Sequence, residues 1–313
     1  MLRFLLSRLL ATVPVLMVVA ILVFSLLRLT PGDPAAVIAG NNATLEDIER
    51  IRVTLGLDQP WPQQFLTWVV HLLQGDAGYS FYLGKPVAVL ISERVAPTLS
   101  VAFGTLVLAV CAAVPLGTWA AWRMGGWLDK ALMGLAVAGF SVPVFVVGYL
   151  LILLFSVQLH WLPVQGYVPM AEDAMAWVAH LTLPWLALSV VYIALLARVT
   201  RASVSEALTE DYIRTAQAKG LGTASVLVRH ALANAAVPIV TVVGISFALL
   251  VGGVVVTETV FSIPGLGSLT VDAVLNRDFP VIQGVVLFFS VVYVFINLLV
   301  DLSYVAFDPR IRY

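Results

Sequence analysis

The stretch Val95–Trp122, VAPTLSVAFGTLVLAVCAAVPLGTWAAW, decides the fold class, because its 28 residues include no Asp, Glu, Lys, Arg or His. A helix needs about 20 predominantly apolar residues to cross the hydrocarbon core of a bilayer. Five further stretches of 17 to 29 residues share this property: Leu9–Leu27, Ala131–Leu159, Leu181–Ala197, Ala231–Thr257 and Phe279–Val300. Barrel strands would be shorter and would alternate in polarity. The sequence therefore predicts an all-α polytopic membrane protein with six transmembrane helices.

The composition supports the same class. The chain has 313 residues, of which 61% are hydrophobic and 11% are charged, whereas an average soluble domain is about 25% charged. The net charge of -1 gives no global basic footprint for nucleic acid. A single cysteine, Cys111, excludes an internal disulfide framework. Membrane lipid is therefore an expected partner, and nucleic acid is not.

The distribution of basic residues predicts the orientation. With the N-terminus inside, the inner segments hold 11 of the 17 Lys and Arg residues, so both termini are expected in the cytoplasm. The first apolar run exceeds the 7–15 residues typical of a secretory signal and is interpreted as a retained span. The expected organisation is an N-terminal segment and first helix at 1–29, an external loop at 30–94 and a five-helix core at 95–313. The core includes a cytosolic loop at about 198–236.

Two helices are expected in the external loop. Thr44 resembles a helix N-cap, Gly56 follows as a C-cap, and Glu46 and Arg50 form an i,i+4 pair. A second amphipathic segment covers Trp61–Leu73. Two interpretations stay open: a cap resting on the membrane surface, and a docking surface for an external partner.

The cytosolic loop contains a short helix, predicted at Glu210–Lys219 with Thr209 as its cap. Gly220 ends it, and a second helix begins near Thr223. Three residues are expected on one face of the short helix: Tyr212, Ala216 and Lys219. Such a helix, held between two spans, can transmit a push, although its spacing alone also fits a solvated connector.

Prolines lie inside or at the ends of several predicted spans, where each can kink a helix or free a carbonyl. They are Pro14, Pro115, Pro143 and Pro184. Packing geometry and a hinge are both open interpretations for each of them. Two carboxylates, Glu258 and Asp278, flank the last outer loop and are candidates for an external gate.

The segment Asp211–Leu221, DYIRTAQAKGL, followed by Arg229–Leu232, RHAL, resembles the EAA loop of ABC importer permeases in the dipeptide, oligopeptide and nickel branch. The Glu-Ala-Ala of the family falls on Arg214–Ala216, so arginine replaces the acidic residue. The glycine of the loop is Gly220.

Other segments resemble the same branch, in the same order and over essentially the whole chain. They are Leu27–Pro34, LRLTPGDP; Glu258–Gly267, ETVFSIPGLG; Asn276–Gly284, NRDFPVIQG; and Asp308–Tyr313, DPRIRY. Several long motifs in the right order identify the chain as a member of this branch, similar to its B-type subunit with the enlarged external loop.

The resemblance implies a multi-pass permease subunit of the bacterial inner membrane, with the type I importer fold. It would form half of the pathway for dipeptides or short oligopeptides. The implied partners are a C-type permease, two cytosolic ABC ATPases and an external binding protein. ATP and Mg²⁺ would bind the ATPases, with no cofactor on this chain. The implied ATPase-coupling residues are Asp211, Tyr212, Arg214, Thr215, Ala216, Lys219, Gly220 and Leu221.

Alternatives remain for the function. Within the family, the substrate could be nickel or a metal chelate. A scaffold would not need the loop around Gly220, and a secondary transporter would need ionisable groups at mid-membrane, which these runs lack. There is no phosphate-binding loop motif, and the four histidines lack metal-ligand spacing. An intramembrane serine protease would need a histidine inside a span. The sequence therefore predicts a non-catalytic chain with no metal site.

Overall fold

The computed structural model describes residues 2–29, 35–36, 44–54, 56–80 and 82–307. Most of the family-like segment Leu27–Pro34, from Thr30 on, and the C-terminal segment Asp308–Tyr313 lie outside the described residues. The chain divides into two compact units. Unit 1 is Met1–Ala96 with Pro264–Val294, and unit 2 is Pro97–Ile263 with Phe295–Tyr313. The sequence predicted a division at 1–29, 30–94 and 95–313 according to the side of the membrane. The two units reflect packing within the fold, so they do not test that division, which stays a prediction.

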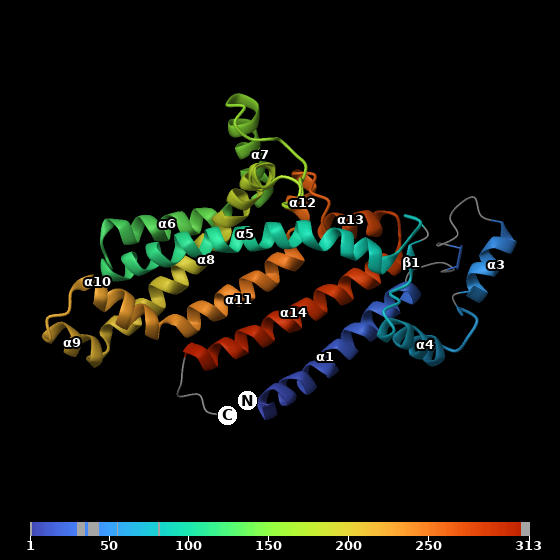
Figure 1. Cartoon of the computed structure of the whole chain (residues 1–313), viewed down its shortest axis with the longest axis horizontal. Coiled ribbons are helices and arrows are strands. Elements are labelled where there is room, and N and C mark those ends of the chain that lie inside the picture. Colours follow the sequence, from blue (N-terminus) through green and yellow to red (C-terminus); the bar gives the residue numbers. More distant parts are fainter. Residues whose placement is uncertain (1, 30–34, 37–43, 55, 81, 308–313) are drawn as a thin grey trace. The chain divides into compact units, whose positions relative to one another are not determined.

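Nearly all regular structure is helical (Figure 1). The first half of the chain forms α1 (Leu2–Leu29), α3 (Leu45–Thr54), α4 (Trp61–Leu73), β1 (Tyr79–Ser80), β2 (Lys85–Pro86), α5 (Val87–Trp122), α6 (Trp127–Ser141), α7 (Val144–Leu151) and the π-helix η1 (Ile152–Gln158). The second half forms α8 (Ala174–Thr209), α9 (Asp211–Ala218), α10 (Thr223–Ser225), the π-helix η2 (Val226–Leu232), α11 (Ala236–Gly253), α12 (Val255–Val260), α13 (Leu266–Leu275) and α14 (Phe279–Phe307).

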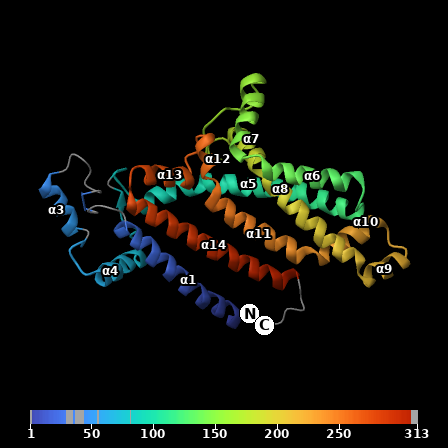
Figure 2. The ribbon, with the colours of Figure 1, turned by 180° about the vertical axis from the view of Figure 1, so that it is seen from behind.

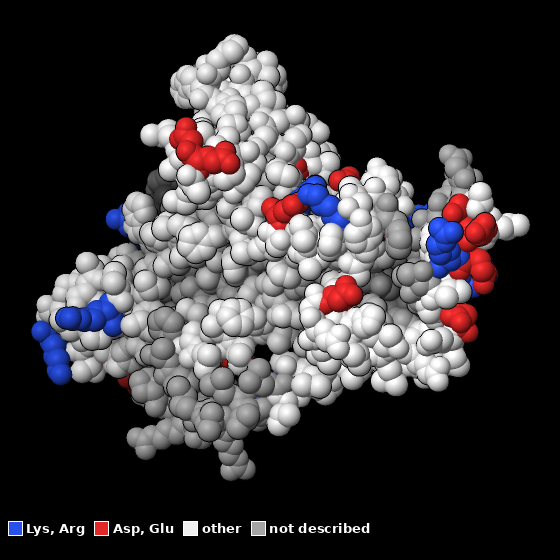
Figure 3. Space-filling model, turned by 45° about the vertical axis from the view of Figure 1, so that its right-hand side comes forward, with Lys and Arg blue, Asp and Glu red and all other residues white. Residues whose placement is uncertain are grey.

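Candidate membrane spans are identified by the length and the apolar composition of the helices. Within the described residues, four helices are long and apolar enough to cross a membrane: Val87–Trp122, Ala174–Thr209, Ala236–Gly253 and Phe279–Tyr304. A bent pair, Asp129–Ser141 with Val144–Gln158, makes a fifth if it is one span. The first predicted span falls in α1, whose described apolar part is Leu10–Leu26. Charged side chains cover little of the face drawn in Figure 3, as expected for a chain surrounded by lipid.

The third predicted span, Ala131–Leu159, is not one straight helix. It bends by 97° between Ser141 and Val144. Pro143 has no N–H to donate, and its ring disfavours the helical region for the residue before it. Val142 accordingly has φ -95° and ψ 123°, which is extended backbone. Absence of charge predicted the apolar run, but the local break at Pro143 divides it into α6 and α7.

Unit 1 has a core in which residues near the start of α5, in α13 and near the start of α14 pack together: Val87, Leu90, Ile91, Leu266, Leu269, Ala273, Val281 and Val285. The α14 side chain Gln283 donates to the Val23 carbonyl of α1 at 3.2 Å. Phe24 of α1 contacts the rings of Phe65 and Trp68, with centroids 5.3 and 5.6 Å away, so α4 packs against α1 (Figure 2).

Local chemistry correctly predicted the two helices expected between residues 30 and 94. Thr44 Oγ1 accepts from the Asp47 N–H at 3.2 Å, and Asp47 Oδ2 accepts from the Thr44 N–H at 3.1 Å, which is a capping box for α3. Gly56 has φ +61°, and Glu46 and Arg50 are paired at 3.6 Å. The bounds of α4 match the prediction. The short antiparallel pairing of β1 with β2 was not predicted.

Unit 2 is built on close contact between α5 and α8. Ala109 and Ala113 of α5 pack with Leu196 and Ala197 of α8. Gly117 brings the two helices still closer, because a Cβ placed there would lie 2.6 Å from the Ala197 carbonyl oxygen. Small residues at this contact let the backbones approach, as is common between membrane helices.

Candidate coupling site

The short helix α9 forms as predicted, within one residue at each end. It covers Asp211–Ala218, with Glu210 and Lys219 as its flanking cap residues. The predicted cap, Thr209, is wrong: its hydroxyl donates to the Glu206 carbonyl at 2.7 Å, because α8 continues through Thr209. Figure 1 shows α9 joined to the end of α8 within unit 2.

The turn after α9 is a Schellman motif. The Gly220 N–H donates to the Gln217 carbonyl at 2.9 Å, and the Leu221 N–H donates to the Ala216 carbonyl at 3.3 Å. Gly220 has φ +78°, in the left-handed region that favours glycine. The prediction that Gly220 ends the helix is confirmed, and its left-handed conformation lets the Gly220 and Leu221 N–H groups donate to two carbonyls near the end of the helix.

One face of α9 is buried and the rest is exposed. Ile213 is 1% exposed and Ala216 is 6% exposed. The other predicted coupling residues are exposed: Asp211, Tyr212, Arg214, Thr215, Lys219, Gly220 and Leu221. Of the three residues predicted to share a face, Ala216 is therefore buried, whereas Tyr212 and Lys219 are exposed. Ile213 was missing from the predicted set, although its i,i+3 spacing to Ala216 marks an apolar face.

A buried cluster holds α9 in place. Ile213 packs with the end of α5, the end of α8, η2 and α11, through Ala121, Val204, Ala207, Val226, Ala231, Ala235 and Ile239. The inner face of α9 is thus part of a buried cluster to which four other elements of unit 2 also contribute.

The exposed face of α9 offers polar groups. Arg214 Nη1 lies 3.3 Å from Asp211 Oδ1, but the two side chains are 76% and 94% exposed, so the pair contributes little to stability. Burial and the nearby Glu210 carboxylate raise the pKa of Tyr212 above its ordinary value. The phenol therefore stays neutral near pH 7 and is available as a hydrogen-bond donor.

The two predicted gate residues are both buried, in different units. Glu258 of α12 is 0% exposed, and its Oε1 accepts from the Thr98 hydroxyl at 2.6 Å. Asp278 is 6% exposed, and its Oδ2 accepts from the Ser80 hydroxyl at 2.5 Å. Each carboxylate thus joins its segment to a distant part of the same unit. Their role as a gate stays a prediction.

We expect Asp278→Asn to flatten the pH dependence of stability. Burial raises the pKa of Asp278, although the Ser80 hydroxyl and the Val281 N–H oppose this. The folded state then binds this proton more tightly than the unfolded state does, so the free energy of unfolding falls as pH rises from the unfolded pKa through the folded one. Thermal unfolding of the purified protein in detergent, followed from about pH 4 to 7, checks this.

The control for this experiment is Ser80→Ala. Removing a hydroxyl that stabilises the carboxylate raises the pKa of Asp278 further, so the pH dependence should become steeper than in the wild type. Parallel stability profiles for the wild type and Asp278→Asn would contradict the prediction.

Comparisons with known families cover almost the whole chain. Residues 113–313 match the family described as "Binding-protein-dependent transport system inner membrane component". Residues 1–102 match the family described as "Binding-prot-dependent transport system membrane comp, N-term". The first match includes α9 and the turn at Gly220.

Similar proteins match over their full length. A probable peptide ABC transporter permease protein of Sinorhizobium fredii is 53% identical over 310 residues, which cover 99% of both chains. A putative peptide transport system permease protein of Brucella abortus is 46% identical, with 98% of both chains covered. A glutathione transport system permease protein of Salmonella choleraesuis is 45% identical, with 100% of both covered.

A solved structure shares the fold. A chain of the MetNI methionine ABC transporter, in an inward-facing conformation, matches with a TM-score of 0.59 and 18% identity. The match covers 70% of this chain and 96% of that chain. The predicted helical fold of the type I importer is thereby confirmed.

Proposed function

The chain belongs to the family of binding-protein-dependent transport system inner membrane components, and we propose that it is a permease subunit through which an ABC importer takes up dipeptides or short oligopeptides. The observation that carries this proposal is the full-length similarity to proteins named for peptide and glutathione transport, at 45% to 53% identity. Glutathione is itself a short peptide. These names do not favour nickel or a metal chelate.

We propose that α9 is the helix through which an ATPase drives this subunit. Its inner face is anchored by Ile213 and Ala216, and its outer face presents Tyr212, Arg214 and Lys219. A short helix with a buried anchor moves as a rigid element. In this proposal ATP and Mg²⁺ bind the partner ATPases, and this chain supplies no catalytic group and no cofactor.

The full assembly that we propose contains this chain, a C-type permease, two cytosolic ATPases and an external binding protein. The excess of Lys and Arg in the inner segments supports an orientation with both termini in the cytoplasm. On the outer side, Glu258 and Asp278 are proposed gate residues, because each is a buried carboxylate that accepts a hydrogen bond from a hydroxyl in a distant part of its own unit.

The test begins with purification of the tagged chain from its native membrane in mild detergent, followed by mass spectrometry of the proteins that accompany it. We expect a second permease and two ATPase subunits. The complex is then reconstituted in liposomes with its binding protein. Dipeptides, glutathione and nickel complexes are compared for uptake and for stimulation of ATP hydrolysis.

Uptake of dipeptides or short oligopeptides, dependent on ATP and on the binding protein, is the expected result. Uptake of the nickel complex alone would overturn the peptide proposal and leave the importer family intact. Purification of the chain without any ATPase, under conditions that preserve known importers, would contradict the assembly and favour a scaffold or a secondary transporter.

A further inference from the structure

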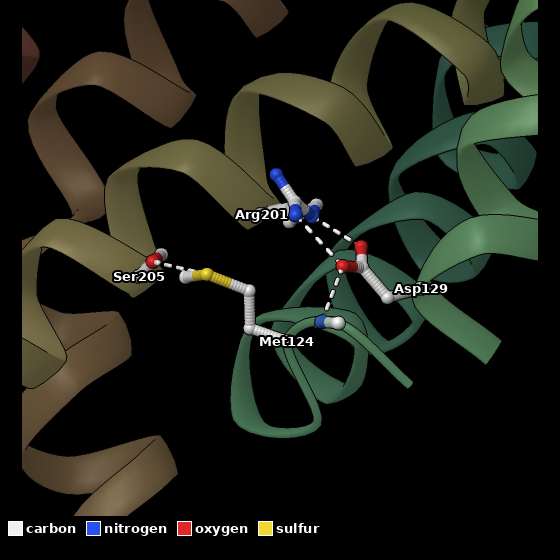
Figure 4. A network of polar contacts seen from close by, with 5 residues as sticks. Met124, Asp129, Arg201 and Ser205 are labelled. Atoms are coloured by element: carbon white, nitrogen blue, oxygen red, sulfur yellow. Dashed lines mark hydrogen bonds and ion pairs between the residues drawn. The ribbon is translucent and has the colours of Figure 1, made fainter. Parts of the chain in front are cut away.

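A buried ion pair in unit 2 has no part in the function proposed so far. Asp129 lies in the first turn of α6, and its side chain is 5% exposed. The Arg201 guanidinium of α8 donates to it through two nitrogens, Nε to Oδ1 and Nη2 to Oδ2, the second at 2.8 Å. The Gly125 N–H donates to Oδ2 at 2.9 Å. Figure 4 shows this network between α6 and α8.

The geometry requires these residue types. Two parallel N–H donors on a planar guanidinium match a carboxylate, whereas a lysine ammonium makes a single-point contact. The third donor, Gly125, fixes the carboxylate from the turn that joins α5 to α6. Because Asp129 is buried, loss of Arg201 would leave its carboxylate charge without compensation. In an exposed pair such as Glu46–Arg50, water solvates the remaining charge.

The turn between α5 and α6 makes a second contact with α8. Ser205 lies one helical turn beyond Arg201, and its hydroxyl contacts the sulfur of Met124 at 4.0 Å (Figure 4). Met124 belongs to the turn between α5 and α6. Arg201 and Ser205 are spaced i,i+4, so they share a face of α8. The turn therefore contacts α8 along one full helical turn.

The part of α8 that contacts this turn, around Arg201 and Ser205, lies close to the start of α9. Arg201 precedes the end of α8 at Thr209 by eight residues, and α9 begins at Asp211. Val204 and Ala207, in the same part of α8, share a buried cluster with Ile213 of α9. The α5–α6 turn, the end of α8 and α9 are thus connected by one continuous set of contacts.

We propose that Asp129 is a positioning residue that ties α6 to α8, so that a displacement of α9 moves both helices together. This inference rests on the proposed role of α9 as the helix driven by the ATPase. With the pair intact, the movement reaches α6 and the bend at Pro143. Without it, α6 follows α8 less closely, and ATP hydrolysis drives less transport.

The experiment uses the complete reconstituted transporter and measures substrate uptake per ATP hydrolysed. Asp129→Asn removes the charge, and Arg201→Lys keeps the buried charge compensated while losing the two-point contact. In both variants, uptake per ATP hydrolysed should fall. In Asp129→Asn it should fall by roughly fivefold or more, which is the lower end of the coupling factors typical between linked sites. Arg201→Lys should fall less.

Glu93→Gln is the matched control. Glu93 pairs with Lys85 at 3.0 Å, but their side chains are 48% and 50% exposed, so this change should leave uptake per ATP as in the wild type. The amount of assembled complex and its thermal midpoint are measured for every variant. A drop in uptake that only follows loss of complex would overturn the positioning role, and so would wild-type uptake per ATP in assembled Arg201→Lys.

A conformational measurement separates positioning from simple bracing. Spin labels are attached at Leu135→Cys in α6 and Gln217→Cys in α9, both exposed, after Cys111→Ala removes the native thiol. The distance between them should stay constant when ATP is trapped, and it should change in Asp129→Asn. A constant distance in both would overturn the proposal.

Failure of this inference is distinguishable from failure of the proposed function. If the wild-type complex takes up no peptide in response to ATP, the proposed function fails. If the wild type transports peptide and the assembled Asp129→Asn complex does so with the same uptake per ATP, only the positioning role fails.

Discussion

Substrate uptake should fall by about tenfold or more, with ATP hydrolysis retained, when Gly220 is replaced by valine. Gly220 has φ +78°, which a β-branched residue adopts only with strain. No atom lies within 4 Å of a Cβ placed there, so the strain comes from the backbone alone. The turn that ends α9 must then change conformation, and the Gln217 and Ala216 carbonyls lose their donors. Paired assays of uptake and ATP hydrolysis in the reconstituted transporter check this result.

Gly222 offers a matched control two residues away. It too has open space around it, but its backbone is extended, with φ -65° and ψ 152°, which valine tolerates. Gly222→Val should therefore keep the wild-type ratio of uptake to ATP hydrolysis. Gly220→Asn should recover part of the uptake, because asparagine enters the left-handed region more readily than other residues with a side chain. If Gly220→Val and Gly222→Val showed the same ratio of uptake to ATP hydrolysis, the left-handed turn at Gly220 would have no role in coupling.

Gly117→Ala should lower the stability of the purified chain by about 1–3 kcal/mol, and Gly117→Val by more. A Cβ at this position lies 2.6 Å from the Ala197 oxygen, 2.7 Å from the Thr200 Cβ and 3.1 Å from the Arg201 nitrogen. These atoms belong to the backbone of α8 or are attached directly to it, so they cannot move without α8. The thermal midpoint of unfolding in detergent measures the effect.

The same substitution at Gly134 should have the opposite sign. Gly134 lies inside α6, and no atom lies within 4 Å of a Cβ placed there. Alanine favours a helix by up to about 1 kcal/mol over glycine, so Gly134→Ala should be neutral or stabilising. A loss of stability at Gly134 equal to that at Gly117 would show that close contact of α5 with α8 is not the cause.

Local chemistry made part of the structure predictable. The capping residues around α3, the bounds of α4 and the end of α9 at Gly220 all follow from side chains within a few residues of each boundary. The absence of charge located the apolar helices, because lipid imposes the same requirement on every residue of a span.

Other features depend on contacts that no local pattern encodes. Asp129 and Arg201 are 72 residues apart, and neither has a sequence context that indicates its partner. The buried side of α9 was not predicted, because helical spacing does not reveal that Ile213 packs in a cluster with residues distant in the sequence. The sequence favours Thr209 as a cap, because no local pattern indicates that α8 continues through it.

The length of α8 has a mechanical consequence. Its uncharged stretch ends at Ala197, and the helix continues from Arg198 to Thr209, a distance of roughly 18 Å at 1.5 Å per residue. If the uncharged stretch lies in the hydrocarbon core, this extension carries α9 clear of the lipid headgroups. The extension then acts as a lever arm, so a small tilt of α8 within the bilayer produces a larger sideways stroke at α9. The stiffness of this extension determines how much of a displacement at α9 reaches the part of α8 before Arg198.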